Sequence, residues 1–144
     1  MKVESILTVK GSEVETIASD APLMRAAQRM AVLHIGALVV SHDRKQLEGF
    51  VSERDIVYGI ARRGRSLLQM QVRDVMHSDP PVCRPDDSLR DVMAKMTRLR
   101  VRHLPVVDHG VLCGLVSIGD VVKNRLEEME TETNVLREAY IARK

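Results

Sequence analysis

The chain has 144 residues, enough for one domain or for two half-domains that bury a core together. Its 22 lysines and arginines face 20 acidic residues, and the net charge of +2 gives no general attraction to nucleic acid or to a membrane surface. With one Phe, two Tyr and no Trp, the chain also lacks the aromatic residues that stack on single-stranded bases, so nucleic-acid binding is only a weak alternative.

Sequence features typical of secretion, membrane insertion or catalysis are missing. Residues 1–10 are interrupted by charges, unlike a signal peptide, and the longest apolar run, residues 35–40, is too short to cross a bilayer. Cys83 and Cys113 do not form a CxxC pair, and the five histidines form no HxxxH or HExxH motif. We therefore expect a soluble, cytoplasmic protein with no membrane partner, catalytic activity, catalytic cofactor or metal.

The first half of the chain predicts a strand, a helix, two strands and a second helix. An extended segment at 15–20 leads into a helix whose apolar residues recur at spacings of three and four. Two apolar runs around a polar turn, 37–40 and 47–51, predict a hairpin, and another helix follows from Glu53. Gly64 predicts the end of that helix.

The second half predicts the same order of elements and a long final helix. An extended segment at 82–87 precedes an apolar helical stripe at 89–96, and the runs 104–107 and 111–116 predict a second hairpin. From Asp120 to the C-terminus there is no Gly or Pro. A heptad seam along this helix favours pairing with a second copy, so we expect a homodimer; the alternative is that the first part of the seam packs on its own domain. The seam comprises Val122, Leu126, Met129, Thr133, Leu136 and Tyr140.

Matching residues recur at a nearly constant distance, which indicates an internal repeat. Asp20 and Asp86, each the expected N-cap of a helix, are 66 residues apart. We predict a mixed α/β (α+β) fold in which two β-α-β-β-α repeats, 1–68 and 69–144, pack as a pseudo-twofold pair with a long C-terminal helix. Because each copy needs the other to complete a core, the functional site is expected where the copies meet.

A Ser-x-x-Asp motif closes the hairpin of each repeat, at Ser52–Asp55 and at Ser117–Asp120. Directly before a helix, this motif forms a capping box, which is the structural interpretation. A helix N-terminus with free N–H groups and a hydroxyl also binds anions, and a carboxylate beside it suits the hydrogen-bond-donating diol of a ribose. The motif alone leaves both interpretations open.

The residues around this motif resemble the cystathionine beta-synthase (CBS) domain, and two such domains in tandem form a Bateman module. The resemblance covers residues 3–125, with Ser19 and Leu38 of the first copy in place of prolines. Three motifs carry it in the same order in both copies: Thr16–Asp20, Ile35–Val40 and Gly49–Asp55 in the first, and Val82–Asp86, Arg102–Val107 and Gly114–Asp120 in the second.

The resemblance implies a non-catalytic regulatory module that binds an adenosine-containing ligand in clefts between the repeats. The ligands it implies are AMP, ADP, ATP, NAD or S-adenosylmethionine. By position, Asp55 and Asp120 would bind ribose hydroxyls, with Ser52 and Ser117 beside phosphate. Phosphate counter-charges would be Arg54, Arg102 and His103. The adenine slots would be formed by the extended backbone around Thr16, Ile17, Val82 and Cys83 together with Ala37, Leu38, Leu104 and Pro105.

The two copies differ in their charged residues. Arg54 of the first copy aligns with Gly119, and the pair Arg102-His103 of the second aligns with Ile35-Gly36. The two clefts therefore need not bind the same ligand, and the sequence leaves open whether Arg102 serves the ligand at Asp55. The rival interpretation is a ligand-free dimerisation scaffold for a partner protein, and no attached catalytic or transport domain identifies a regulated partner.

Overall fold

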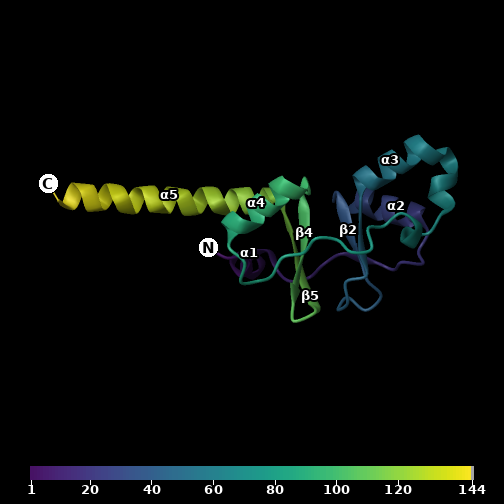
Figure 1. Ribbon diagram of the computed structural model, residues 1–144, viewed down its shortest axis with the longest axis horizontal. Helices are drawn as coiled ribbons and strands as arrows, with labels where there is room; N and C mark the ends of the chain where they lie inside the picture. Colours follow the sequence, from purple (N-terminus) through teal and green to yellow (C-terminus); the bar gives the residue numbers. More distant parts are fainter. Residues whose placement is uncertain (144) are drawn as a thin grey trace.

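Two small β-sheets, one from each half of the chain, form the centre of the structure, a computed structural model that describes residues 1–143 (Figure 1). In the first sheet, β1 (Thr16–Ile17) runs parallel to β2 (Ala37–Val40), which pairs antiparallel with β3 (Gly49–Ser52). The second sheet is the antiparallel pair β4 (His103–Asp108) and β5 (Val111–Ser117). Both hairpins lie where the apolar runs predicted them.

Helices flank each sheet and bury their apolar stripes against it. In the first lobe these are α2 (Leu23–Leu33) and α3 (Glu53–Arg63), and in the second α4 (Leu89–Leu99) and α5 (Ile118–Ala142). Two 3-10 helices, η1 (Gly64–Gln69) and η2 (Val72–Asp74), follow α3. The predicted mixed fold with two similar halves and a long C-terminal helix is confirmed. The buried stripe residues are Leu23, Ala26 and Met30 in α2 and Leu89, Val92 and Met96 in α4.

The extended segment 82–87 was predicted as a strand, but it makes a single parallel bridge to β4, at Cys83. In the first repeat the parallel pairing of β1 with β2 begins where the Val39 N–H donates to the carbonyl oxygen of Glu15 at 3.3 Å. The residue at the place of Val39 in the second repeat is Pro105, which has no N–H. This pairing is therefore shorter in the second repeat.

The N-caps expected at Asp20 and Asp86 were also wrong. Pro22 precedes α2 and provides no side-chain cap, and Ser88 caps α4 by accepting the Asp91 N–H at 3.1 Å. Ser88 directly precedes the first helical residue, so its hydroxyl is the side-chain group that reaches the free N–H groups of the first turn.

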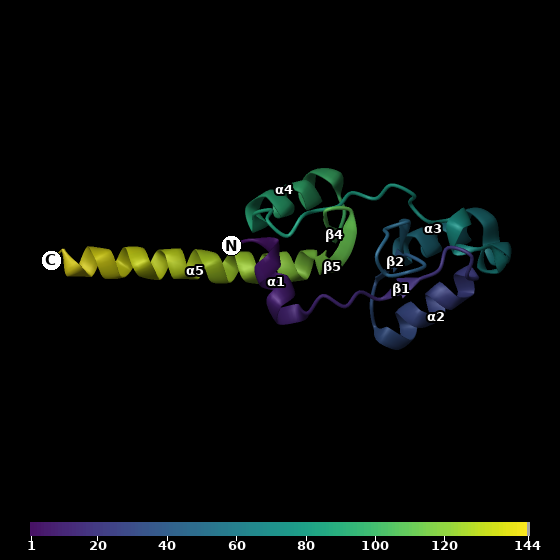
Figure 2. The ribbon, with the colours of Figure 1, turned by 90° about the horizontal axis from the view of Figure 1, so that it is seen from below.

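An N-terminal helix that the sequence analysis did not predict, α1 (Val3–Lys10), packs in the second lobe although it lies at the start of the first repeat. Its Val3 and Ile6 are buried in the core built by α4, β4 and β5, and Figure 2 shows it beside the start of α5. Conversely, Val72 of η2 lies at the start of the second repeat and is buried in the core of the first lobe. We call residues 3–10 and 72–77 the leader segments.

Each leader segment contacts the hairpin of the other repeat at matching glycines. A Cβ on Gly49 would lie 2.6 Å from Met76 Sδ, and a Cβ on Gly114 would lie 2.5 Å from Leu7 Cδ2. The second leader also pairs with β3, since the Phe50 and His77 backbones exchange hydrogen bonds of 3.0 and 2.9 Å. The lobes therefore interlock through their leaders, and a division of the chain at 68/69 stays a prediction.

The helix α5 projects far beyond the second lobe (Figure 1). Of its described residues only Val121 is buried, while the seam positions Leu126, Met129 and Leu136 are 56%, 47% and 71% exposed. The N-terminal ammonium of Met1, just before α1, forms an ion pair with Glu128 of α5, at 2.8 Å from its Oε1. Within residues 1–143 there is no helix with both the length and the apolar character needed to cross a membrane.

Candidate functional site

Both Ser-x-x-Asp motifs form capping boxes. The Ser52 N–H donates to Asp55 Oδ2 at 2.8 Å, and the Asp55 N–H donates to Ser52 Oγ at 3.3 Å. The same pair of bonds in the second copy, between Ser117 and Asp120, measures 3.0 and 3.1 Å. The structural interpretation of the motif is therefore confirmed in both copies, and any ligand role comes in addition to it.

Each capping aspartate is also contacted by a basic side chain from a leader segment. His77 Nε2 lies 2.8 Å from Asp55 Oδ1, and Lys10 Nζ donates to Asp120 Oδ2 at 2.7 Å and to the Leu115 carbonyl oxygen at 3.1 Å. Burial alone would raise the pKa of Asp120, but the hydrogen bonds from Lys10 and from the Ser117 N–H outweigh it and hold that pKa below its ordinary value. The two aspartates thus have different partners.

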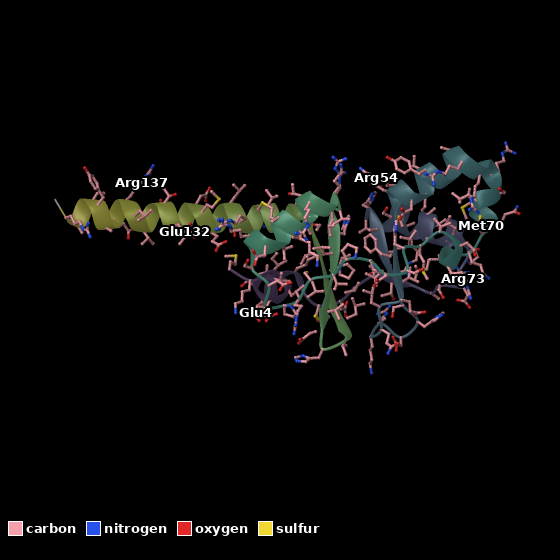
Figure 3. All side chains as sticks on the ribbon, in the orientation of Figure 1. Glu4, Arg54, Met70, Arg73, Glu132 and Arg137 are labelled. Atoms are coloured by element: carbon pink, nitrogen blue, oxygen red, sulfur yellow. The ribbon has the colours of Figure 1, made fainter. Side chains whose placement is uncertain are left out.

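A cavity of about 230 Å³ lies between the two lobes and draws its walls from both repeats. Ser52 and Arg54 line it from the start of α3, and Arg102 and His103 line it from the start of β4. Figure 3 shows Arg54 at the edge of the first lobe that faces the second. Arg102 of the second copy therefore lines the same cavity as Ser52 and Arg54 of the first.

The cavity also brings in residues that the sequence analysis did not select. Phe50, His77 and Arg100 line it, and the Phe50 and His103 ring centroids lie 6.0 Å apart at one wall. Asp55 does not line the cavity itself, but it contacts His77, which does. His77 and Arg100 carried no motif signal, because their place at the site depends on how the lobes pack.

The predicted adenine-binding residues do not line this cavity. Arg29 of α2 donates to the Thr16 carbonyl oxygen, and Lys95 of α4 donates to that of Val82, so both acceptors are already engaged. The side chains of the other predicted members are buried: Ile17, Ala37, Leu38, Cys83, Leu104 and Pro105. Ser117 and Asp120 also lie outside the cavity.

The strand register corrects the sequence alignment of the two hairpins by one residue. Ala37 lies opposite Ser52, whereas His103 lies opposite Ser117. His103 therefore corresponds to Ala37, and Arg102 corresponds to Gly36 rather than to Ile35. The motif residues Pro105 and Leu38 do not correspond either, because hairpin register is set by backbone pairing.

The environment of His103, one of the predicted phosphate counter-charges, disfavours the protonated form of its ring. Burial lowers the pKa of its imidazole, and the neighbouring positive charges of Lys10 and Arg102 lower it further against the opposing effect of Asp120 and Glu53. A neutral ring can donate or accept one hydrogen bond and present a flat face, but it does not neutralise phosphate. The positive charge at this wall comes from arginine.

A family model for the CBS domain matches the chain twice, over residues 3–62 and 72–127. The chain belongs to the CBS-domain family. The two matches begin in the two leader segments, so each CBS repeat of the sequence contributes its leader to the core of the other.

Solved structures and curated proteins resemble this CBS-domain pair along most of its length. A CBS-domain containing protein from Agrobacterium tumefaciens, ATU1752, is 36% identical, with a TM-score of 0.83 over 87% of this chain and 99% of that one. PAE2072 from Pyrobaculum aerophilum, solved with AMP, is 26% identical, with a TM-score of 0.76 over 92% and 99%. The mitochondrial CBS domain-containing protein CBSX3 of Arabidopsis thaliana is 35% identical over 85% of this chain, which spans 61% of that relative.

Proposed function

We propose that this CBS-domain pair is a non-catalytic regulatory module that binds an adenosine-containing ligand in the cavity between its repeats. The observation that carries the proposal is the cavity itself, which joins Ser52 and Arg54 of one CBS repeat to Arg102 and His103 of the other. A ligand bound there contacts both lobes, so binding and the relative position of the lobes are linked. The AMP complex of PAE2072 supports this choice of ligand class.

In this proposal the ribose diol binds Asp55, whose second carboxylate oxygen now faces His77. Because the His77 side chain is 62% exposed, its contact with Asp55 is screened by solvent and is readily exchanged for ribose hydroxyls. The rings of Phe50 and His103 offer flat surfaces for the base. The specific ligands proposed are AMP, ADP, ATP and NAD.

The two cysteines give no support to an enzymatic alternative. Burial raises the pKa of the Cys83 thiol to about 12, and it also raises that of Cys113. A thiol with so high a pKa is almost entirely un-ionised at neutral pH, whereas the thiolate is the nucleophile. Neither sulfur lines the cavity between the lobes.

Thermal unfolding with and without nucleotides tests the proposal. A ligand at one hundred times its Kd adds about 2.7 kcal/mol to the free energy of unfolding, which for a chain of this size raises Tm by roughly 5 to 10 °C. The adenine nucleotides should produce this shift and uridine nucleotides should not. Asp55→Asn should abolish it, while Asp86→Asn, an exposed change outside the cavity, should leave it intact.

The proposal fails if no adenine nucleotide shifts the melt of the parent chain. It also fails if Asp55→Asn responds to nucleotide like the parent, because the ribose acceptor would then lie elsewhere. Asparagine keeps an oxygen that can accept the capping N–H bonds, so Asp55→Asn tests the carboxylate charge with little damage to the start of α3.

We propose further that the module is a homodimer to which α5 contributes. The exposed seam residues of α5 supply the supporting observation, since long apolar side chains repeated every three or four residues are typical of helix pairing. A dimer would also serve the rival function, a scaffold for another protein without a ligand. Nucleotide-dependent stabilisation distinguishes the two functions, because only the regulatory module requires it.

A further inference from the structure

Three arginine side chains, Arg54, Arg100 and Arg102, line the cavity between the lobes and also an adjoining hollow of about 300 Å³. Arg54 is the second residue of α3, and Arg100 and Arg102 flank the turn between α4 and β4. Within residues 1–143, none of the three guanidinium groups forms an ion pair or donates a hydrogen bond to another residue.

The charges are distributed unevenly between the two spaces. Glu53 and Asp79 also line the cavity, and Asp55 lies behind His77, so acidic groups lie on the side proposed for the ribose. The hollow has no acidic residue in its walls, which apart from the three arginines consist of Met96, Thr97, Val101 and Ile118. A ligand that fills both spaces would place neutral hydroxyl groups near the carboxylates and its own negative charge among the arginines.

The backbone does not require arginine at two of these positions. Arg100 ends α4 in the left-handed conformation with φ 55°, and His34 ends α2 in the same way with φ 53°. The Arg102 carbonyl oxygen accepts the Ile118 N–H, just as that of Gly36 accepts the Glu53 N–H in the first repeat. The same local structure is thus built with His and Gly in the first copy, so the backbone does not require a positive charge at either position.

We propose that Arg54, Arg100 and Arg102 select an adenosine ligand that contains a pyrophosphate group, such as ADP, ATP or NAD, a refinement that rests on the proposed function. The three guanidinium groups line two adjoining spaces, and two linked phosphates bring more negative charge and a longer reach to them than one terminal phosphate does. S-adenosylmethionine, whose sulfonium and ammonium groups bring positive charge, is repelled by the same groups. Adenosine with no phosphate leaves the hollow empty.

Calorimetric titrations of ADP, AMP, adenosine and S-adenosylmethionine at one ionic strength test this selection. ADP should bind at least about tenfold more tightly than AMP, since each additional charge-assisted hydrogen bond that ADP makes is worth about that factor. Arg100→Gln should weaken ADP by about tenfold or more, weaken AMP much less and leave adenosine unchanged. Arg98→Gln is the matched control, because Arg98 is on the last turn of the same helix but lines neither space.

Titration with inorganic pyrophosphate tests the arginine site without the nucleoside. Pyrophosphate should bind the parent chain and Arg98→Gln, and bind Arg100→Gln at least about tenfold more weakly. If adenine nucleotides do not bind but pyrophosphate does in this way, the proposed function fails and the arginine site stands. Equal affinities for ADP and AMP, or an equal loss of ADP, AMP and adenosine in Arg100→Gln, would overturn the inference. Melting curves of both variants without ligand verify that they are folded.

Discussion

Lys10→Met should destabilise the protein more at neutral pH than at low pH. The Lys10 ammonium donates to Asp120 and to the Leu115 carbonyl oxygen, and methionine removes both bonds while keeping an unbranched apolar side chain. The side chains of Lys10 and Asp120 are 43% and 28% exposed, so solvent screens the pair and its contribution is at most about 1 kcal/mol. For a chain of this size that is a loss of roughly 2 to 4 °C in Tm.

The pH dependence follows from the lowered pKa of Asp120 in the folded protein. Because the folded-state pKa lies below the unfolded value of about 3.9, the stabilisation is complete above that value. It is lost as the pH falls through the folded pKa, where Asp120 becomes protonated. The stability difference between the parent and Lys10→Met should therefore be about 1 kcal/mol at pH 7 and should decrease as the pH falls below about 3.9, leaving the part contributed by the bond to the Leu115 carbonyl oxygen.

Urea unfolding at a series of pH values measures this difference, with Lys2→Met as the control. Lys2 precedes α1 at its other end, and among residues 1–143 its side chain has no hydrogen-bond or ion-pair partner, so its replacement should change stability little at any pH. A loss of stability in Lys10→Met that is equal at pH 3 and pH 7 would refute the reasoning. It would mean that Lys10 acts through its aliphatic packing or its bond to the Leu115 carbonyl oxygen and not through Asp120.

Two further predictions concern the dimer and the leader segments. Light scattering during gel filtration should find a dimer for the parent chain. The double substitution Leu126→Asp with Leu136→Asp should weaken this dimer because burying a leucine is worth about 1.5 to 3 kcal/mol. A monomeric parent chain at tens of micromolar would contradict the prediction. Gly49→Ala should destabilise more than Gly114→Ala, within the roughly 1 to 3 kcal/mol typical of overpacking. Its Cβ would meet the His77 carbonyl oxygen at 2.9 Å, whereas the Cβ at Gly114 meets only a movable leucine side chain. Equal losses in urea unfolding would contradict the predicted order.

The sequence by itself determined the elements of each repeat and their order. The alternating apolar runs and the spacings of three and four are local properties of the chain, and they predicted both hairpins and α2 to α5. The Ser-x-x-Asp motif forms its capping box within four residues, so each copy could be recognised without knowledge of the rest of the fold. The family resemblance followed from the same short motifs and is confirmed by the two matches to the CBS domain.

Only the tertiary structure decided which residues meet at the site. His77 contacts Asp55 because the second leader packs on the first lobe, and Lys10 contacts Asp120 because α1 packs on the second. Arg100 joins Arg54 at the cavity only when the two lobes come together. These contacts join residues far apart in the sequence and depend on how the lobes interlock, which a local pattern of apolar and polar residues does not specify.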